Sequence, residues 1–339
     1  MKLLIWGAGA IGGTIGAHLA RAGHPVTLVD RAAEHVGAIN RAGLEVSGPV
    51  ARFTASMPAF TPDEVAGRFE TVLLATKAQD TADAARAILP YLSPDGYVVS
   101  AQNGLNELTL AEIVGPERTV GAFVNFGADY IEPGLIHYAG RGAFVLGELD
   151  GKITPRLEAL RQTLLNFDDG VAITSNIWGY LWGKEAYGAM LFATALTDES
   201  IADAFAAPEY RDLYIALAGE VLSIAQARGV TPEAFNGFDP LAFAPGADPA
   251  ASARSLDELV AFNRRSAKTH SGVWRDLAVR KRRTEVDDQI GIIAAIGAQS
   301  DVPTPLIARL VELIHDIEDG RRPQSLTTLD LLKARMTPL

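Results

Sequence analysis

The sequence predicts an α/β protein, with a doubly wound, mainly parallel sheet at the N-terminus and an all-helical domain at the C-terminus. Up to about residue 172, short apolar runs alternate with patterns of helical period. After it, long segments of helical period follow one another without strand-like runs. At 339 residues, the chain also has the length of about two domains. We therefore predict one domain over residues 1–172 and a second over residues 173–339.

Strand-like runs in the N-terminal half set the expected sheet. Helical patterns separate the earlier runs, which indicates βαβ units and parallel pairing. The last three runs lack long helices between them, so we expect an antiparallel extension with Pro133 and Gly134 at a turn. In chain order the runs are KLLIWG, HPVTLVD, TVLLATK, GYVVSAQN, RTVGAFVNF, GLIHYAG and AFVLGEL.

The C-terminal half is predicted to be helical throughout, apart from one long loop. The stretch 237–252 is rich in Pro, Gly and Ala, which is typical of a loop. Helical periodicity covers residues 176–196, 209–228, 255–268, 272–298 and 303–319.

Composition excludes several classes of site and partner. The chain has no cysteine, which rules out disulfides, thiolate zinc sites, iron–sulfur clusters and cysteine nucleophiles, and we predict no metal site. The formal net charge of −11 opposes binding to nucleic acid or anionic lipid, since both need a basic surface. No window of about 18 residues is free of breakers and charge, so we expect no membrane span. These features favour a cytoplasmic protein.

A glycine-rich turn follows the first predicted strand, KLLIW. Gly7, Gly9 and Gly12 have the spacing G-x-G-x-x-G, with Ala10 and Ile11 between the last two. Because a pyrophosphate needs close backbone approach and the positive end of a helix, the turn predicts a dinucleotide site of the Rossmann type. A turn that serves packing alone is the alternative. The strand before it, the helix after it and an acid at the next strand end favour the dinucleotide.

Two adjacent residues bear on which dinucleotide binds. The second strand, VTLVD, ends at Asp30, where a carboxylate would bond the ribose hydroxyls and repel a 2′-phosphate. Arg31 follows and would pair with that phosphate. The cofactor is therefore NAD or NADP, and the position of Asp30 favours NAD. Arg31 also fits a solvated loop charge.

Polar residues end the next two predicted strands. Lys77 follows TVLLA, and Gln102, Asn103 and Gly104 follow YVVSA. Ligands of open α/β sheets bind at the carboxyl ends of the strands, so Lys77 and Asn103 are candidate cofactor or substrate residues. The alternatives are a surface lysine and a plain turn.

Several motifs together resemble the ketopantoate reductase family, the NADPH-dependent 2-dehydropantoate 2-reductases. They are GAGAIGG, TKAQDT, QNGLNE, WGK followed by TALT, and TEVD, and their order and spacing agree nearly from end to end. The resemblance implies a Rossmann domain joined to a helical domain, with a 2-oxo acid in the cleft between them. Hydride would pass from the nicotinamide to the carbonyl carbon.

The resemblance also implies roles for particular residues. Lys184 matches the general acid that protonates the carbonyl oxygen, and Glu285 matches a glutamate that binds a substrate hydroxyl. Asn103 and Lys77 match residues that position cofactor and substrate. Carbonyl reduction independently needs a proton donor or cation beside the developing oxyanion. On its own, Lys184 also fits an ammonium reaching water from a buried helix, and Glu285 an acid in the first turn of a helix.

The sequence departs from the family along the helix that carries Lys184. Family members have asparagines four and eight residues after the lysine, where this chain has Gly188 and Phe192. These positions share one helix face, so the pocket loses two amides and gains a ring, which puts ketopantoate itself in doubt. His270 and Ser271 lie where the family usually has serines, and both are candidate substrate residues. A lone histidine is more often a structural hydrogen-bonding group.

The leading hypothesis is an oxidoreductase of this family acting on 2-dehydropantoate or a related hydroxylated 2-oxo acid, or on the matching 2-hydroxy acid. Two alternatives remain open: a noncatalytic module that senses NAD(P), and an enzyme of opine-type reductive amination. A homodimer through the helical domain is expected by analogy alone. The basic run RKRR at 280–283 is typical of a solvated face, and we exclude it from the predicted site.

Overall fold

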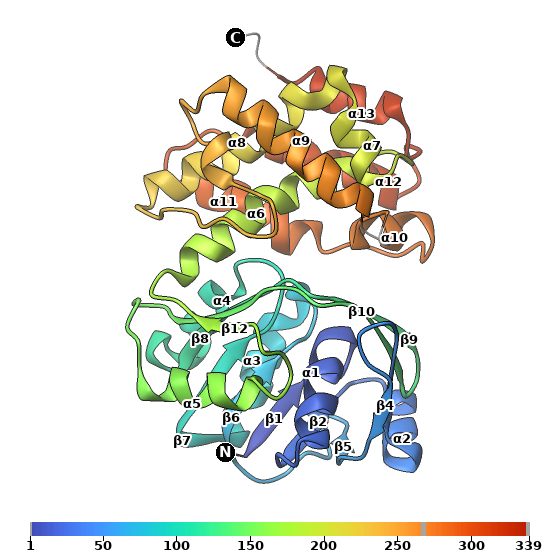
Figure 1. Ribbon diagram of the computed structural model, residues 1–339, viewed down its shortest axis with the longest axis vertical. Helices are drawn as coiled ribbons and strands as arrows, with labels where there is room; N and C mark the ends of the chain where they lie inside the picture. Colours follow the sequence, from blue (N-terminus) through green and yellow to red (C-terminus); the bar gives the residue numbers. More distant parts are fainter. Residues whose placement is uncertain (1, 266–268, 337–339) are drawn as a thin grey trace. The chain divides into compact units, whose positions relative to one another are not determined.

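The computed structural model describes residues 2–265 and 269–336 (Figure 1). The chain forms two compact units, Met1–Ile177 and Trp178–Leu339. All the described strands lie in the first unit, and the second is built from helices. The predicted fold class, a mainly parallel α/β sheet followed by a helical region, is confirmed. The division falls after Ile177, and the boundary predicted after residue 172 stays a prediction.

The main sheet has eight strands in the order β12-β11-β8-β7-β6-β1-β2-β5. From β5 to β8 every neighbouring pair is parallel, which is the strand order of a Rossmann fold. The order reverses between β1 and β6, so their carboxyl ends form the switch point at which ligands bind. The strands are β1 (Leu3–Trp6), β2 (Val26–Val29), β5 (Ala59–Phe60), β6 (Phe69–Leu74), β7 (Leu92–Ser100), β8 (Thr119–Val124), β11 (Phe144–Glu148) and β12 (Val171–Ile173).

Two assignments in the predicted antiparallel extension are wrong. β8 pairs parallel with β7, because α4 (Asn106–Val114) forms a helical crossover between them. The run GLIHYAG leaves the main sheet and pairs with β3 in a second sheet, in the order β4-β3-β10-β9. The antiparallel pairing of β11 with β8 and the turn at Pro133 and Gly134 are confirmed. The second sheet contains β3 (Leu44–Ser47), β4 (Phe53–Ala55), β9 (Gly127–Glu132) and β10 (Leu135–Gly140).

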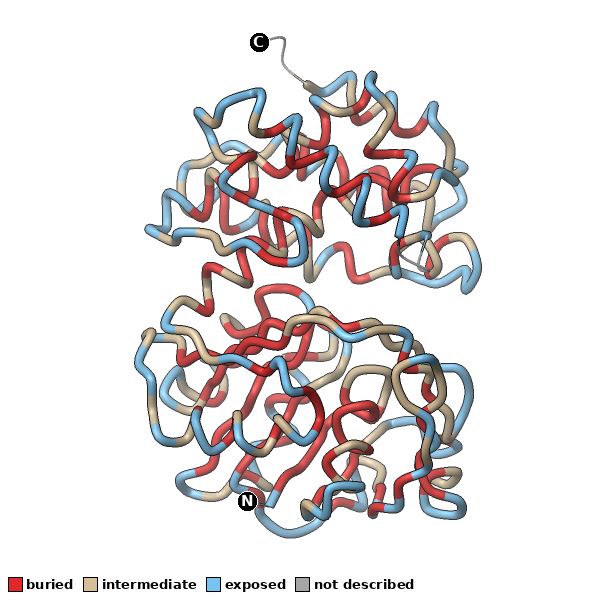
Figure 2. Tube along the Cα trace, viewed as in Figure 1, coloured by how far each residue is buried: buried red, intermediate tan, exposed pale blue. Residues whose placement is uncertain are grey.

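Alternate residues of β1 pack into different hydrophobic clusters. Leu3 and Ile5 join the cluster that contains residues of α1, α2 and α5, whereas Leu4 and Trp6 join the one that contains residues of α3 and α4. A fully buried leucine or isoleucine contributes about 1.5–3 kcal/mol, so helices on both faces hold the strands firmly. The strands are largely buried in Figure 2. The helices are α1 (Ala10–Arg21), α2 (Ala33–Ala42), α3 (Thr81–Ile88) and α5 (Pro155–Leu164).

The helical unit largely follows the predicted segments. Helices are confirmed within 176–196, 209–228 and 303–319. The helix predicted over 255–268 begins earlier, at Pro249, because proline suits the first helical position, so the predicted loop 237–252 is shorter. Residues 266–268 lie outside the described part of the chain. The helices are α6 (Ile177–Thr194), α7 (Ile201–Ala206), α8 (Arg211–Ala227), α9 (Pro249–Arg265), α10 (Gly272–Ala278), α11 (Ile292–Gln299), α12 (Pro305–Glu318) and α13 (Leu326–Lys333).

The single helix predicted over 272–298 is wrong. α10 ends at Ala278, and a π-helical turn over Asp287–Gly291 precedes α11. Asp276, within α10, accepts hydrogen bonds through its carboxylate from two arginines that follow the helix: Arg280 at 2.8 Å and Arg282 at 3.1 Å. These bonds turn the chain back towards α10, and periodicity alone does not report them.

Candidate active site

The three glycines of the turn after β1 have different spatial surroundings. Gly7 has a φ of +102°, and a Cβ there would lie 2.7 Å from the carbonyl carbon of Ala75. A Cβ on Gly12 would overlap the carbonyl oxygen of Gly7. A Cβ on Gly9 would meet nothing within 4 Å. Packing therefore requires the first and third glycines, whereas the second leaves open space of the kind a ligand's phosphate can approach.

The N-terminus of α1 suits an anion. The helix begins at Ala10 with Gly9 as its N-cap, and among the described residues no side chain caps it and no acid lies in its first turn. Ala10, Ile11 and Gly12 thus present first-turn N–H groups and the positive end of the helix dipole. This set fits the pyrophosphate of a dinucleotide.

Asp30 joins the glycine turn to the start of α2. Its Oδ2 accepts a hydrogen bond from Ala8 N, and its Oδ1 accepts one from Ala32 N, both at 2.9 Å. An ionised carboxylate has about four acceptor sites, so two remain for the hydroxyls of a ribose. The carboxylate therefore fits the ribose role and also supports the loop.

Arg31 makes a surface ion pair. Its Nη1 lies 3.2 Å from Asp80 Oδ1, and its side chain is 76% exposed. Exposed pairs contribute about 0–1 kcal/mol, so this contact holds the guanidinium only weakly. Asp80 ends the short 3-10 turn that follows Lys77, so Arg31 already has an acidic partner.

His35 also supports the glycine turn, and the sequence offered no signal for it. The histidine is fully buried on α2; its Nε2 donates to Ala8 O at 2.9 Å, and its Nδ1 accepts from Gly134 N at 3.0 Å. Because Nδ1 accepts a hydrogen bond, the proton of the neutral ring lies on Nε2. One ring therefore ties the glycine turn to the β9–β10 hairpin. Its partners lie 27 and 99 residues away in the chain, beyond any local motif.

A buried polar network connects the ends of β6 and β7. Gln102 Nε2 donates to Thr76 O at 3.1 Å and to Thr81 Oγ1 at 2.8 Å, and Thr81 in turn donates to Asn106 Oδ1. Asn106 Nδ2 donates to Asn103 O at 2.6 Å. Gln102 therefore has a structural task, and its network orders the strand ends on which the exposed Lys77 and Asn103 lie.

Lys184 lies half-buried on α6, among residues that are nearly inaccessible. Trp182 is 2% exposed and Ala186 0%. Gly188, one turn later, has room for a side chain, since a Cβ would meet only Glu185 Oε2, at 3.9 Å. This part of α6 thus combines one lysine with buried neighbours, the Glu185 carboxylate among them, and with room for a Cβ at Gly188.

Phe192 lies one turn after Gly188 on α6 and is only 2% exposed. Tyr187, three residues after Lys184, receives a hydrogen bond from Asn263 Nδ2 at 3.3 Å, and desolvation raises the pKa of Tyr187 to about 12. The phenol therefore keeps its proton at neutral pH. Lys184 is the one lysine or arginine within α6, Ile177–Thr194.

His270 and Ser271 both take part in local structure. Ser271 caps α10 by accepting a hydrogen bond from Trp274 N at 3.1 Å, and it is 4% exposed. His270 contacts Thr269 Oγ1 through Nδ1 and Asp198 O through Nε2, with its ring 4.0 Å from that of Trp274. Their role towards a substrate stays a prediction.

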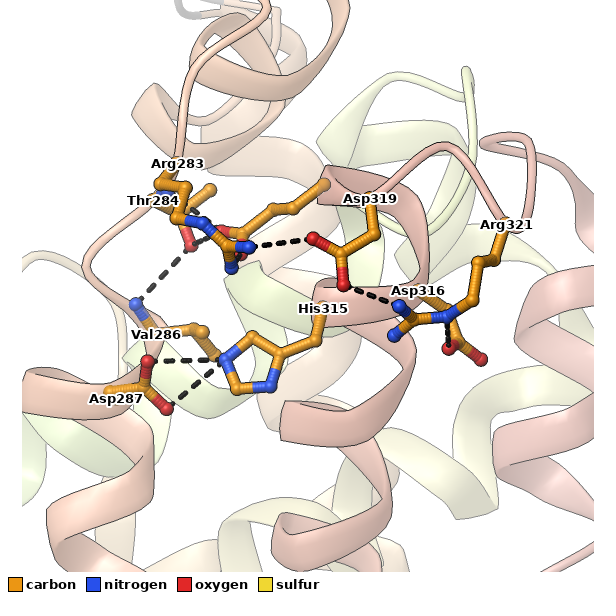
Figure 3. A network of polar contacts seen from close by, with 9 residues as sticks. Arg283, Thr284, Val286, Asp287, His315, Asp316, Asp319 and Arg321 are labelled. Carbon is orange, nitrogen blue, oxygen red and sulfur yellow. Dashed lines mark hydrogen bonds and ion pairs between the residues drawn. The ribbon is translucent and has the colours of Figure 1, made fainter.

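Glu285 lies in the segment between α10 and α11 and is 9% exposed. The neighbouring Thr284 donates through both N and Oγ1 to Glu318 Oε1, at 2.7 Å each. Figure 3 shows this network, in which Arg283 pairs with Asp319. The arginines of the run 280–283 thus engage carboxylates, which agrees with excluding the run from the site.

Two absences apply to the described part of the chain. No helix in it combines the length and apolar character needed to cross a bilayer. Nor do three or more His, Asp or Glu side chains gather there in a way that would hold a metal ion. The homodimer and the cytoplasmic location stay predictions.

Two family models match the chain, one for each half. The description "Ketopantoate reductase PanE/ApbA" matches residues 3–151, and "Ketopantoate reductase PanE/ApbA C terminal" matches residues 176–318. The chain belongs to the ketopantoate reductase family. It is an oxidoreductase of that family, and its cofactor is a nicotinamide dinucleotide. The family predicted from the motifs is confirmed.

Individual relatives agree with this assignment. A 2-dehydropantoate 2-reductase of Pyrococcus horikoshii is 34% identical over 190 residues, which span 54% of this chain and 60% of that protein. One from Halobacterium salinarum is 26% identical over 318 residues, covering 93% of this chain and 98% of the relative.

Solved structures share the fold over nearly the whole chain. A PanE/ApbA family ketopantoate reductase from Ralstonia eutropha JMP134 has a TM-score of 0.80 at 26% identity, covering 95% of this chain and 99% of its own. D-mandelate dehydrogenase with NADH and anilino(oxo)acetate has a TM-score of 0.82 at 24% identity, covering 94% and 99%. The second likeness shows the fold alone.

Proposed function

We propose that the protein interconverts a 2-oxo acid and the matching 2-hydroxy acid. Lys184 carries the proposal, because this half-buried lysine stands on a largely apolar helix of a chain with a dinucleotide turn. A carbonyl that accepts hydride needs a proton donor beside the developing oxyanion, and the ammonium of a lysine can supply that proton. The relatives named 2-dehydropantoate 2-reductase support a 2-oxo acid substrate, and the fold shared with D-mandelate dehydrogenase is compatible with it.

Each proposed site residue has one task. When bound, the dinucleotide supplies the hydride. Lys184 donates a proton to the carbonyl oxygen, where negative charge develops during reduction. Asn103 donates a hydrogen bond that orients cofactor or substrate, and Lys77 offers a cation to an acidic substrate. Glu285 accepts a hydrogen bond from a substrate hydroxyl.

The face of α6 beyond Lys184 narrows the substrate. Gly188 has no side chain and Phe192 has no polar group, so neither offers the amide that family members use. A site that lacks a hydrogen-bonding partner does not select the molecule that needs it. We therefore propose a hydroxylated 2-oxo acid that depends less on such amides than 2-dehydropantoate does.

NAD is the proposed cofactor. Asp30 places a fixed negative charge at the end of β2, and Arg31 is already paired with Asp80. A 2′-phosphate would meet repulsion from the first carboxylate and competition from the second. Asp30→Asn, which keeps an acceptor and removes the charge, should raise the ratio of NADPH to NADH use about tenfold. Steady-state rates with both cofactors check this, and a wild type that prefers NADPH would contradict the proposal.

The reaction itself is tested by nicotinamide absorbance across a panel of 2-oxo acids, 2-dehydropantoate and an aromatic 2-oxo acid included. Lys184→Met should lower kcat about 10²- to 10⁴-fold and leave the dissociation constant of the cofactor unchanged. Lys152→Met is the matched control, because that lysine is exposed and forms a surface ion pair with Asp150.

The same panel separates the alternatives. A sensing module would bind the cofactor and turn over no acid, and an opine-type enzyme would need an amine in the assay. Family membership favours the reductase over both. An active Lys184→Met variant would remove the lysine from the mechanism.

A further inference from the structure

The last turn of α12 carries a carboxylate in an unfavourable position. Glu318 ends the helix, where the negative end of the dipole opposes an acid, and its side chain is only 2% exposed. Burying a charge is costly unless it is paired and hydrogen-bonded. Helix stability therefore does not explain this glutamate, and its partners must.

The Glu318 carboxylate accepts hydrogen bonds from two adjacent residues of one short segment. Oε1 accepts from Thr284 N and from Thr284 Oγ1, at 2.7 Å each, and Oε2 accepts from Arg283 Nη1 at 3.0 Å. Bonds between a carboxylate and such donors are among the stronger hydrogen bonds in proteins. Glu318 thus holds the backbone immediately before Glu285.

The backbone after Glu285 is held by the same group of atoms. Thr284 Oγ1, while donating to Glu318, accepts from Val286 N at 3.2 Å. Glu285 O accepts from Gln289 N at 2.9 Å, at the π-helical turn. The Glu285–Val286 peptide unit is therefore tied to Glu318 through the Thr284 hydroxyl, and the Arg283–Thr284 unit is tied to Glu318 directly.

A second residue of α12 holds the far end of the segment. His315, three residues before Glu318 and so on the same helix face, contacts Asp287 at 3.1 Å (Figure 3). One face of α12 therefore holds both ends of residues 284–287. A π-helical turn begins at that point, and such turns occur frequently at functional sites.

We propose that Glu318 is a positioning residue for substrate recognition: through Thr284 it fixes the backbone that carries Glu285, and so orients the Glu285 carboxylate towards the substrate hydroxyl. This inference rests on the proposed role of Glu285. Glu318 itself acts through Thr284 and has no contact with substrate in this scheme. Loss of the positioning should weaken recognition of the hydroxyl before it affects proton transfer from Lys184.

The test compares a hydroxylated 2-oxo acid with its deoxy analogue in single and double variants. Glu285→Ala should remove most of the preference for the hydroxylated substrate. Glu318→Ala should raise KM for that substrate about tenfold, lower the preference about as far, and leave the KM of the cofactor and the kcat for the deoxy analogue within twofold. In the Glu285→Ala, Glu318→Ala double variant, the second change should add little, because coupled residues are not additive.

Two further variants keep the proposal testable if Glu318→Ala folds poorly. Thr284→Val removes the hydroxyl and should shift KM in the same way, whereas Thr284→Ser keeps it and should restore wild-type kinetics. Asp319→Asn is the matched control, since Asp319 pairs with Arg283 but not with Thr284, and its kinetics should stay within twofold of wild type.

The outcomes separate two failures. If Glu285→Ala abolishes the preference while Glu318→Ala and Thr284→Val leave it intact, the positioning role is overturned and the proposed function stands. If the effects of Glu285→Ala and Glu318→Ala add in the double variant, the positioning role is overturned in the same way. If Glu285→Ala itself leaves the preference unchanged, the proposed role of Glu285 fails and the inference falls with it.

Discussion

The glycine turn and the segment that carries Glu285 are held in different ways. At the turn, backbone atoms leave no room for a Cβ on Gly7 or Gly12, and Gly7 N donates to Val29 O at 2.8 Å. At the segment, the Glu318 carboxylate fixes the chain through Thr284, 34 residues away in sequence. A site built from backbone geometry leaves a local motif, whereas one built from distant side chains does not. This difference decides what each region loses on mutation.

The largest effects are expected from two single substitutions in the glycine turn, which are compared with each other. Gly12→Ala drives a Cβ into the backbone at Gly7 and should destabilise the N-terminal unit by about 3 kcal/mol. Gly9→Ala meets open space, so the free energy of unfolding should change by less than about 0.5 kcal/mol while affinity for NADH falls about tenfold. Denaturant unfolding measures the free energy of unfolding, and fluorescence titration measures the affinity for NADH. An unchanged affinity for NADH in the Gly9→Ala variant would contradict a ligand role for Gly9.

A moderate effect is expected at the unfilled position on α6. Gly188→Asn places an amide where the added Cβ meets only Glu185 Oε2, at 3.9 Å. It should raise kcat/KM for 2-dehydropantoate about tenfold relative to other 2-oxo acids. Gly188→Ala is the control: a helical glycine costs about 1 kcal/mol relative to alanine, so this variant should gain stability without changing the preference. The same substrate panel in both variants distinguishes an amide effect from a helix effect.

The smallest effect is expected at the outer end of the α12 network. Hydrogen bonds from Arg321 lower the pKa of Asp316 and of Asp319. An acid with a lowered pKa stabilises the fold above its unfolded pKa of about 4, and that contribution is lost as the pH falls. Arg321→Ala should therefore be slightly less stable than wild type at pH 7, and the two should converge in acid. Unfolding curves measured across this pH range check the prediction. A lower stability with an unchanged KM would show that the ion pairs of Arg321 stabilise the fold without positioning Glu285.

Sequence reasoning recovered the parts of the molecule that short patterns encode. The alternating strands, the glycine turn and the helix that carries Lys184 each depend on neighbours in the chain. The pairing of β10 with β3 was missed because it joins residues about 90 apart in the chain, such as Leu135 and Glu45. The break after α10 was missed because Asp276 captures two arginines that a periodic pattern counts as helical.

The supporting residues of the site were the least predictable. His35 reads as an ordinary helical histidine, and Glu318 as one acid among several near a helix end. Neither belongs to a recognisable motif, because each acts through main-chain groups that any residue type presents. Only the folded chain shows that their side chains fasten the segments on which the proposed site depends.

The second sheet also bears on how the protein is made. On a ribosome, β3 and β4 emerge early, but β10, which pairs with the other edge of β3, is complete only at Gly140. Until then β3 has an unpaired edge, and such edges invite association with other chains. One edge of β11 likewise stays unpaired until β12, which ends at Ile173, has been synthesised. A nascent chain or a truncated fragment that stops before these strands therefore carries open edges, and its solubility depends on the speed at which the rest of the sheet arrives.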